Sequence, residues 1–237
     1  PADVNSFLKT TDDYYNRFEA ATFARIIRYL ASFFAMTLPG LYLAVTNFHT
    51  QILPTSLLLA FWEARIGVPF PEIIEVLLME LSFELLREAG IRLPGALGNT
   101  IGIVGGLILG QAAVSAKIVS PIMIIIIAIT GIGSFATPDY SLGWTYRILR
   151  IIFLFLVALF GFYGIAVGIF ISSVYIGAQK SFGVPVLSPL PKSGSRSMSN
   201  SLFVNPVWKR EKRPSYLGPK SPDEEPQISR KWKIDKE

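Results

Sequence analysis

Long stretches of the chain carry no charged residue, and their lengths suit helices that cross a membrane. None of Asp, Glu, Lys or Arg lies between Tyr29 and Trp62 or between Ile151 and Gln179, and Lys117 is the only one between Leu93 and Pro138. A bilayer core is spanned by about 20 apolar helical residues, and these runs lack the alternation of membrane β-strands. The pattern therefore predicts an all-α fold, a polytopic α-helical membrane protein.

The uncharged runs predict about four transmembrane helices, at 26–45, 96–115, 118–136 and 151–177. Arg147 and Arg150 are expected to open the last of these spans. The first run is longer than one crossing and shorter than two, so we expect it to break at its polar residues near 46–51. A pair of shorter helices is predicted at 52–66 and 71–89, the first capped by Pro54 and the second flanked by Pro69, Pro71 and Pro94. This pair is amphipathic or re-entrant, and whether it crosses the membrane is left open.

Basic residues set the predicted orientation. Residues 183–237 hold 11 Lys and Arg against 6 Asp and Glu, whereas residues 1–182 hold 11 of each. Basic segments that flank a membrane stay cytoplasmic, so the tail is placed inside, and Arg17, Arg25 and Arg28 place the other end inside too. Two ends on one side require an even number of crossings. We expect a cytoplasmic pre-membrane segment at 1–25, a helical membrane domain at 26–180, and at 181–237 a cytoplasmic, disordered basic tail that can touch anionic lipid.

Composition removes several kinds of chemistry. The 237 residues include no cysteine and one histidine, which excludes disulfides, thiolate metal sites and Cys–His catalysis and argues against a Ser–His catalytic pair. No glycine-rich phosphate loop followed by Lys-Ser or Lys-Thr is present. The mean hydropathy of +0.46 is that of a membrane protein. We therefore expect no enzymatic activity, no metal, no cofactor and no nucleic-acid partner.

The predicted helix 71–89 is unusual in such a chain because it carries five carboxylates, Glu72, Glu75, Glu80, Glu84 and Glu88. Glu80, Glu84 and Glu88 fall within an arc of roughly 80°, with Arg87 among them. One hypothesis is local pairing of Glu84 with Arg87 and of Glu88 with Arg92. The other is that Glu80 and Glu84 face a water-filled path, since carboxylates at membrane depth mark ion routes and select cations.

A glycine stripe follows in the predicted span 96–115. Gly98, Gly102, Gly106 and Gly110 recur at every fourth position. This spacing places a smooth surface on one helix face and lets another helix approach closely. The pattern predicts a helix contact, either within one chain or between subunits.

Four segments together resemble the GerA family of spore germination proteins. They are residues 70–135, which include the acidic helix and the glycine stripe, "TTDDYYNRF" at 10–18, "YLAVTNFH" at 42–49 and "SFGVPVLSPL" at 181–190. The resemblance covers about residues 7–192. It implies the C-terminal membrane portion of the A subunit of a germinant receptor.

The resemblance implies a function and partners. A subunits of this kind lie as multi-pass proteins in the spore inner membrane, together with a transporter-like B subunit and a lipoprotein C subunit. The complex responds to nutrients, and the A subunit is thought to form a homo-oligomeric ion channel that triggers germination. Glu80 and Glu84 then become candidates for a cation path, and the glycine stripe becomes a candidate subunit contact. A non-conducting scaffold and a secondary transporter, which would show paired halves, are the alternatives.

Overall fold

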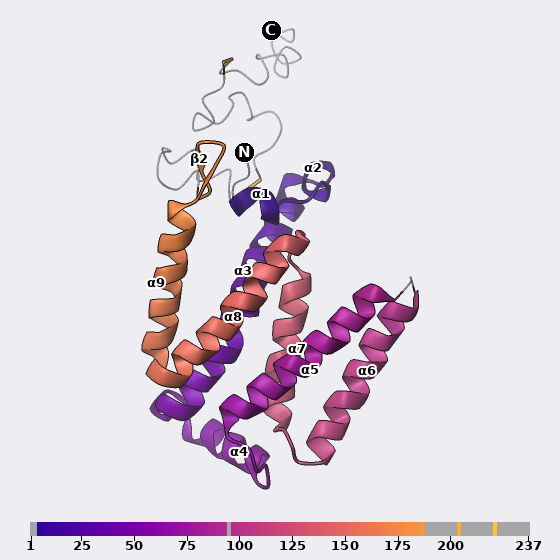
Figure 1. The fold of residues 1–237 in the computed structure, drawn as a ribbon, viewed down its shortest axis with the longest axis vertical. Helices are drawn as coiled ribbons and strands as arrows, with labels where there is room; N and C mark the ends of the chain where they lie inside the picture. The colour runs from indigo at the N-terminus through magenta and orange to yellow at the C-terminus, as the bar shows by residue number, and fades with distance from the viewer. Residues whose placement is uncertain (1–3, 94–95, 188–202, 205–219, 222–237) are drawn as a thin grey trace, which may run out of the picture. The chain divides into compact units, whose positions relative to one another are not determined.

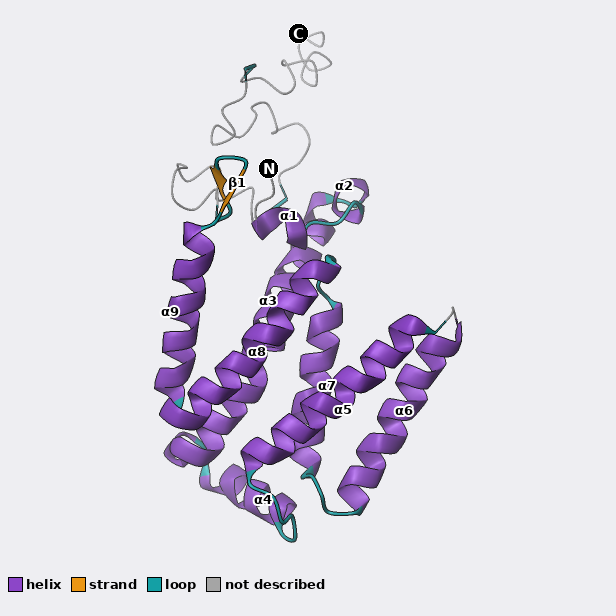
Figure 2. Ribbon diagram, in the orientation of Figure 1, coloured by secondary structure: helices purple, strands orange, loops and turns teal. Residues whose placement is uncertain are grey.

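The computed structural model describes residues 4–93, 96–187, 203–204 and 220–221. Helices dominate this part of the chain (Figure 2). Its only sheet is an antiparallel hairpin of β1 Lys180–Ser181 and β2 Val184–Pro185. The predicted all-α fold class is confirmed. The predicted disordered tail lies outside the described residues for most of its length.

The helices follow one another with short connections (Figure 1). In chain order they are α1 Val4–Leu8, α2 Asp12–Tyr15, α3 Phe18–Leu43, the π-helix η1 Ala44–Phe48, the 3-10 helix η2 Thr50–Ile52, α4 Thr55–Arg65, α5 Glu72–Arg92, α6 Ala96–Ser115, α7 Pro121–Phe135, α8 Tyr140–Phe160 and α9 Phe162–Ala178.

Prolines and polar residues set several of the helix starts. Pro54 and Pro71 directly precede α4 and α5, and Pro121 occupies the first position of α7, where the missing N–H costs nothing. Ser120 caps α7 by accepting a hydrogen bond from the backbone of Met123 at 3.3 Å. The local sequence therefore determines where these three helices begin.

Several predicted helices are confirmed. The helix α6 has the predicted bounds of 96–115. The first run breaks as expected, because α3 gives way to η1 and η2 at 44–52. The acidic helix α5 runs through Gly90 to Arg92, beyond its predicted end.

The predicted single span at 151–177 is wrong. Two helices, α8 and α9, meet there at Gly161, whose φ of +59° is a conformation that favours glycine. A Cβ added to Gly164 of α9 would lie 2.3 Å from the carbonyl oxygen of Leu156 of α8. Small residues thus let the chain reverse tightly, which the uninterrupted apolar run did not reveal. Arg147 and Arg150, expected to open the span, lie inside α8.

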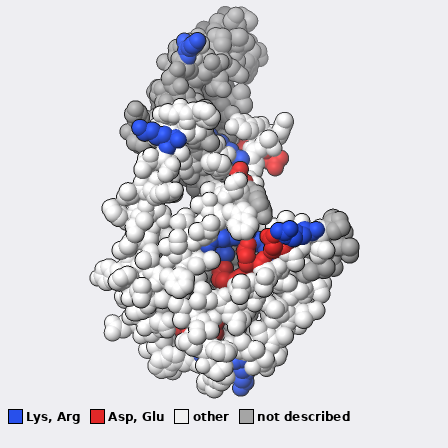
Figure 3. All heavy atoms as spheres, in the orientation of Figure 1, with Lys and Arg blue, Asp and Glu red and all other residues white. Residues whose placement is uncertain are grey.

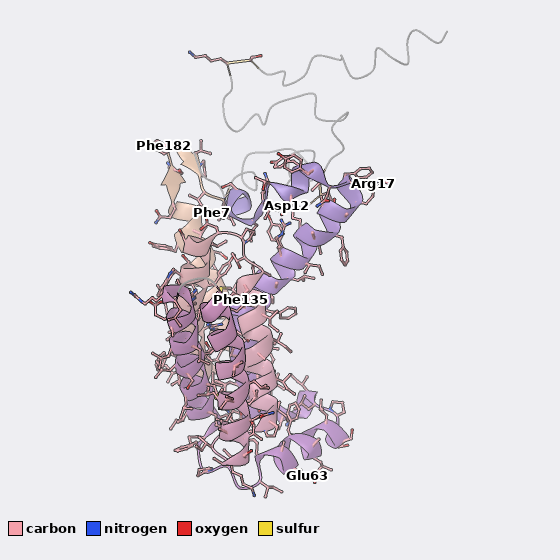
Figure 4. All side chains as sticks on the ribbon, turned by 90° about the vertical axis from the view of Figure 1, so that its right-hand side faces the viewer. Phe7, Asp12, Arg17, Glu63, Phe135 and Phe182 are labelled. Atoms are coloured by element: carbon pink, nitrogen blue, oxygen red, sulfur yellow. The ribbon has the colours of Figure 1, made fainter. Side chains whose placement is uncertain are left out.

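The described chain divides into two compact units. Unit 1 comprises residues 1–30, 137–142 and 170–237, and unit 2 comprises residues 31–136 and 143–169. The core of unit 2 combines side chains from α3, α5, α7, α8 and α9. It contains Leu43, Val76, Met79, Met123, Ile127, Phe153, Leu154, Val157 and Ile165. Figure 4 shows Glu63 on α4 at the opposite end of unit 2 from Phe135 on α7.

In unit 1, a buried charge cluster fastens α2 to the first half of α3. Asp13 accepts hydrogen bonds from Arg25 at 3.0 Å and from Arg28 at 2.6 and 3.0 Å. Burial alone would raise the pKa of Asp13, but the hydrogen bonds and positive charges of Arg28 and Arg25 outweigh it and hold this pKa well below its usual range. Asp13 is therefore ionised at neutral pH.

Two helical stretches are long and apolar enough to cross a membrane, judged by length and composition. They are Phe18–Phe48, which joins α3 to η1, and Ser141–Phe160 of α8. Shorter apolar stretches are Val104–Ser115 of α6, Pro121–Phe135 of α7 and Phe162–Ala178 of α9.

Candidate functional site

The acidic helix α5 is joined to α8 by two ion pairs one helical turn apart. Glu80 pairs with Arg150 at 2.8 Å, and Glu84 pairs with Arg147 at 2.6 Å. Arg87 of α5 also reaches Glu84, at 3.4 Å. On a helix, residues three or four apart share a face, so each helix presents its charges as a short column. We call these five residues the ion-pair ladder.

Two arginines extend the ladder to the other helices of unit 2. Arg150 donates to the backbone carbonyl of Ala35 in α3 at 3.3 Å, and Arg87 donates to the hydroxyl of Ser134 in α7 at 2.7 Å. The Arg87 guanidinium also lies 4.9 Å from the ring centroids of Phe83 and Phe135, a separation at which cation–π attraction operates. Four helices therefore meet through one charged network.

Close packing around Arg87 depends on a glycine. A Cβ added to Gly131 of α7 would lie only 2.4 Å from the ring of Phe83. Since that ring is one of the two that contact Arg87, a larger residue at Gly131 would push against the arginine's surroundings. The glycine belongs to the framework that holds the ladder in place.

Most of the ladder is buried, and one carboxylate reaches the surface. Glu80 is 8% exposed and Arg150 is 3% exposed, whereas the Glu84 side chain is 30% exposed. Figure 3 shows acidic and basic side chains gathered in one band over α5, on a surface of unit 2 that is otherwise mostly uncharged. The ladder thus connects a buried charge pair with this surface band.

The end of α5 beyond the ladder carries a local pair. Glu88 and Arg92 lie 2.7 Å apart, four residues along the helix, with side chains 38% and 77% exposed. The predicted local pairs, Glu84 with Arg87 and Glu88 with Arg92, are therefore both confirmed.

The start of α5 holds the other two carboxylates. Glu72 and Glu75 both pair with Arg65 of α4. Glu72 also accepts from the hydroxyl of Thr46 in η1, and Glu75 accepts from the backbone N–H of Ser120 at 2.9 Å. Both carboxylates are buried and lie in the first turn of α5, where the helix dipole favours negative charge. They fasten α5 to α4 and to the N-terminus of α7.

The glycine stripe of α6 divides into covered and uncovered positions. A Cβ on Gly110 would meet Ile124 of α7 at 3.6 Å, and one on the intervening Gly105 would meet Leu86 of α5 at 2.8 Å. A Cβ on Gly102 or Gly106 would meet no atom of the described chain within 4 Å. The surroundings of Gly98 lie outside what the structure describes. Packing within the chain therefore accounts for one side of α6, and the contact predicted at Gly102 and Gly106 stays a prediction.

Sequence reasoning missed Arg147 and Arg150, which it placed at the mouth of a span. A signal was present, because the two arginines are three residues apart and Glu80 and Glu84 are four apart, so each pair lies on one face of its helix. Nothing in the spacing, however, said that α8 would lie beside α5.

The same stretch of chain also carries a family signature. Residues 1–216 match the family described as "Bacillus/Clostridium GerA spore germination protein". The chain belongs to the GerA family.

Several relatives of this GerA chain are named as spore germination proteins. "Spore germination protein KA" from Bacillus subtilis (strain 168) is 46% identical, in an alignment that covers 90% of this chain and 39% of the relative. "Spore germination protein A1" from the same organism is 39% identical, and the alignment covers 90% of this chain and 44% of the relative. "Spore germination protein GerLA" from Bacillus cereus is 40% identical, and the alignment covers 88% of this chain and 42% of the relative. The chain thus spans less than half the length of these relatives. No solved structure matches this GerA chain.

Proposed function

We propose that this chain is a membrane subunit of a nutrient-responsive spore germinant receptor, and that several copies assemble to form or gate a cation-conducting path. Family membership supports the role in germination. We further propose a multi-pass arrangement in the spore inner membrane, beside a transporter-like B subunit and a lipoprotein C subunit. The apolar helices support the membrane location.

The observation that carries the ion-path proposal is the charged band over α5 (Figure 3). Charged side chains at membrane depth are costly unless they pair or face water. Glu84 pairs with Arg147 through one oxygen at 2.6 Å, and its side chain remains 30% exposed. A carboxylate in this position can attract a cation at the surface once its pairing loosens.

The ladder supports gating in particular. Glu80 and Glu84 are both paired with arginines of α8, so their negative charge is largely compensated while α5 and α8 stay together. A separation of the two helices would break both pairs to α8 at once, because the pairs lie one turn apart, and would leave Glu84 with its longer contact to Arg87 of α5, at 3.4 Å. In this proposal, the closed state is the paired one.

A second candidate is a subunit that only assembles its partners. It is favoured by the pairing of all five α5 carboxylates with arginines, since Arg65 takes Glu72 and Glu75, and Arg92 takes Glu88. In that case the ladder holds the helices together, and the subunit conducts no ions.

Ion flux from liposomes that hold the complete receptor complex, with and without nutrient, tests the proposal. We expect nutrient-dependent cation flux from the natural complex. The double variant Glu80→Gln and Glu84→Gln should change the flux per assembled complex, whatever its abundance, and Glu63→Gln on α4 serves as a control outside the ladder.

The outcomes separate the candidates. A normally assembled double variant with natural flux ends the role of α5 in the path. Loss of abundance without any change in flux per complex assigns the ladder to stability alone. A natural complex that conducts no ions with nutrient favours the scaffold.

A further inference from the structure

Within unit 1, a residue from the C-terminal part of the chain is seated on the start of α3. The backbone N–H of Val204 donates a hydrogen bond to the side-chain oxygen of Thr22 at 3.0 Å. Val204 is only 5% exposed, whereas its neighbour Phe203 is exposed. The contact therefore buries the side chain of Val204 and pairs its backbone N–H, whereas the side chain of Phe203 stays exposed.

Thr22 is prepared for this contact by its own helix. Its hydroxyl donates to the carbonyl of Phe18 one turn earlier, at 2.7 Å, which leaves the oxygen's lone pairs for an incoming N–H. A buried backbone N–H must find an acceptor, and Thr22 supplies one outside any helix or sheet. Ala21, the preceding residue of α3, is buried as well.

A second tie joins the same two ends of the chain. The N–H of Val4, the first residue of α1, donates to the carbonyl of Val186 at 3.0 Å, and the N–H of Val186 donates to Gln179 at 3.0 Å. Segments from both ends of the described chain thus meet twice in unit 1, at Val4 and at Thr22. Both ties use backbone groups, so neither depends on the charges of the tail.

We propose that the first turns of α3 form a docking site for a peptide segment, and that its occupant is the chain's own segment at Phe203 and Val204. The site recognises a free backbone N–H beside a β-branched apolar side chain. It thereby ties the C-terminal segment to α3, which belongs to one of the two stretches long and apolar enough to cross a membrane. This inference is independent of ion conduction.

Engineered cysteines test the docking directly, because the 237 residues contain none. The 3.0 Å contact between Val204 and Thr22 places their Cα atoms within about 7 Å, close to the reach of a disulfide. In the complete protein in membranes, the pair Thr22→Cys and Val204→Cys should cross-link within one chain under mild oxidation. The control pair Phe23→Cys and Val204→Cys uses the next, exposed residue of α3, which is turned by about 100°.

We expect the Thr22 pair to cross-link at least about tenfold faster than the control pair, since disulfides demand specific geometry. Equal rates, or no cross-link in either pair, would overturn the proposal. A product of two linked chains would overturn it too, because the occupant would then be a second copy.

A labelling measurement covers the case in which the paired variants fail to assemble. In the single variant Thr22→Cys, maleimide labelling should rise several-fold when Val204→Asp is added. Phe203→Asp should leave labelling unchanged, because Phe203 is exposed. Equal labelling in all three proteins would overturn the proposal.

Discussion

The buried pair of the ion-pair ladder, Glu80 with Arg150, allows a quantitative prediction. Glu80→Gln keeps the size of the side chain and one oxygen acceptor but removes its charge. Arg150 would then remain 3% exposed beside a neutral amide, while its hydrogen bond to the Ala35 carbonyl, at 3.3 Å, is kept. The variant tests how much the charge itself contributes.

The magnitude follows from burial. Removing one partner of a buried ion pair costs about 3–5 kcal/mol, because the remaining charge is left uncompensated. The glutamine retains an acceptor for Arg150, so we expect the lower end, about 3 kcal/mol, which is roughly a hundredfold change in the ratio of folded to unfolded protein. Such a loss would be visible as reduced abundance in the membrane.

The helix offers a matched control. Glu88→Gln makes the same substitution on α5, but Glu88 pairs with an exposed Arg92 four residues away. Exposed pairs of this kind contribute about 0.5 kcal/mol or less. Thermal unfolding of the purified protein in detergent, together with immunoblots of membranes, should therefore separate the two variants clearly.

Equal stability and equal abundance of Glu80→Gln and Glu88→Gln would refute this reasoning. That result would mean that water reaches Arg150 as readily as Arg92, and the ladder could not then be described as buried.

Three further predictions concern glycines and pH. Leucine at both Gly102 and Gly106 should abolish assembly between chains, seen by cross-linking or native gels, while monomer stability changes little, because no described atom lies within 4 Å of either site. Gly131→Ala should destabilise the protein by about 1–3 kcal/mol in thermal unfolding, since the added methyl meets the ring of Phe83. As a control, Gly143→Ala adds its methyl in open space on α8 and should leave stability unchanged or raise it by up to about 1 kcal/mol. Asp13 has a depressed pKa, so its stabilising contribution is complete above about pH 4 and is lost as the pH falls below that value. The free energy of unfolding, measured against pH, should show this loss in the natural chain and not in Asp13→Asn.

Much of the fold could be predicted because local signals mark helix ends. Pro54, Pro71 and Pro121 lie at or directly before the starts of α4, α5 and α7, so the predicted starts at 52, 71 and 118 are wrong by a few residues at most. The reversal at Gly161 could not be predicted, because no charged or polar cluster interrupts the apolar run. Hydropathy reports the solvent that a segment prefers, and it says nothing of the direction in which the backbone continues.

The candidate site was predictable only where its partners are close in sequence. Helical spacing sufficed for Glu84 with Arg87 and for Glu88 with Arg92. The pairs to Arg147 and Arg150 required knowing that α8 lies beside α5, and the two residues of the Arg147–Glu84 bond are 63 positions apart. Contacts between residues so far apart in the sequence leave no recognisable pattern in the local sequence around either residue.

That separation has a consequence for the order of folding. The α8–α9 reversal joins residues only a few positions apart, such as Gly164 and Leu156, and such short-range contacts close quickly. The ladder can close only after α5, α6 and α7 have been laid down, so its charges are paired late. Substitutions in the ladder should therefore accelerate unfolding more than they slow folding, and a late step of folding would be the one that pairs Glu80 and Glu84 with α8.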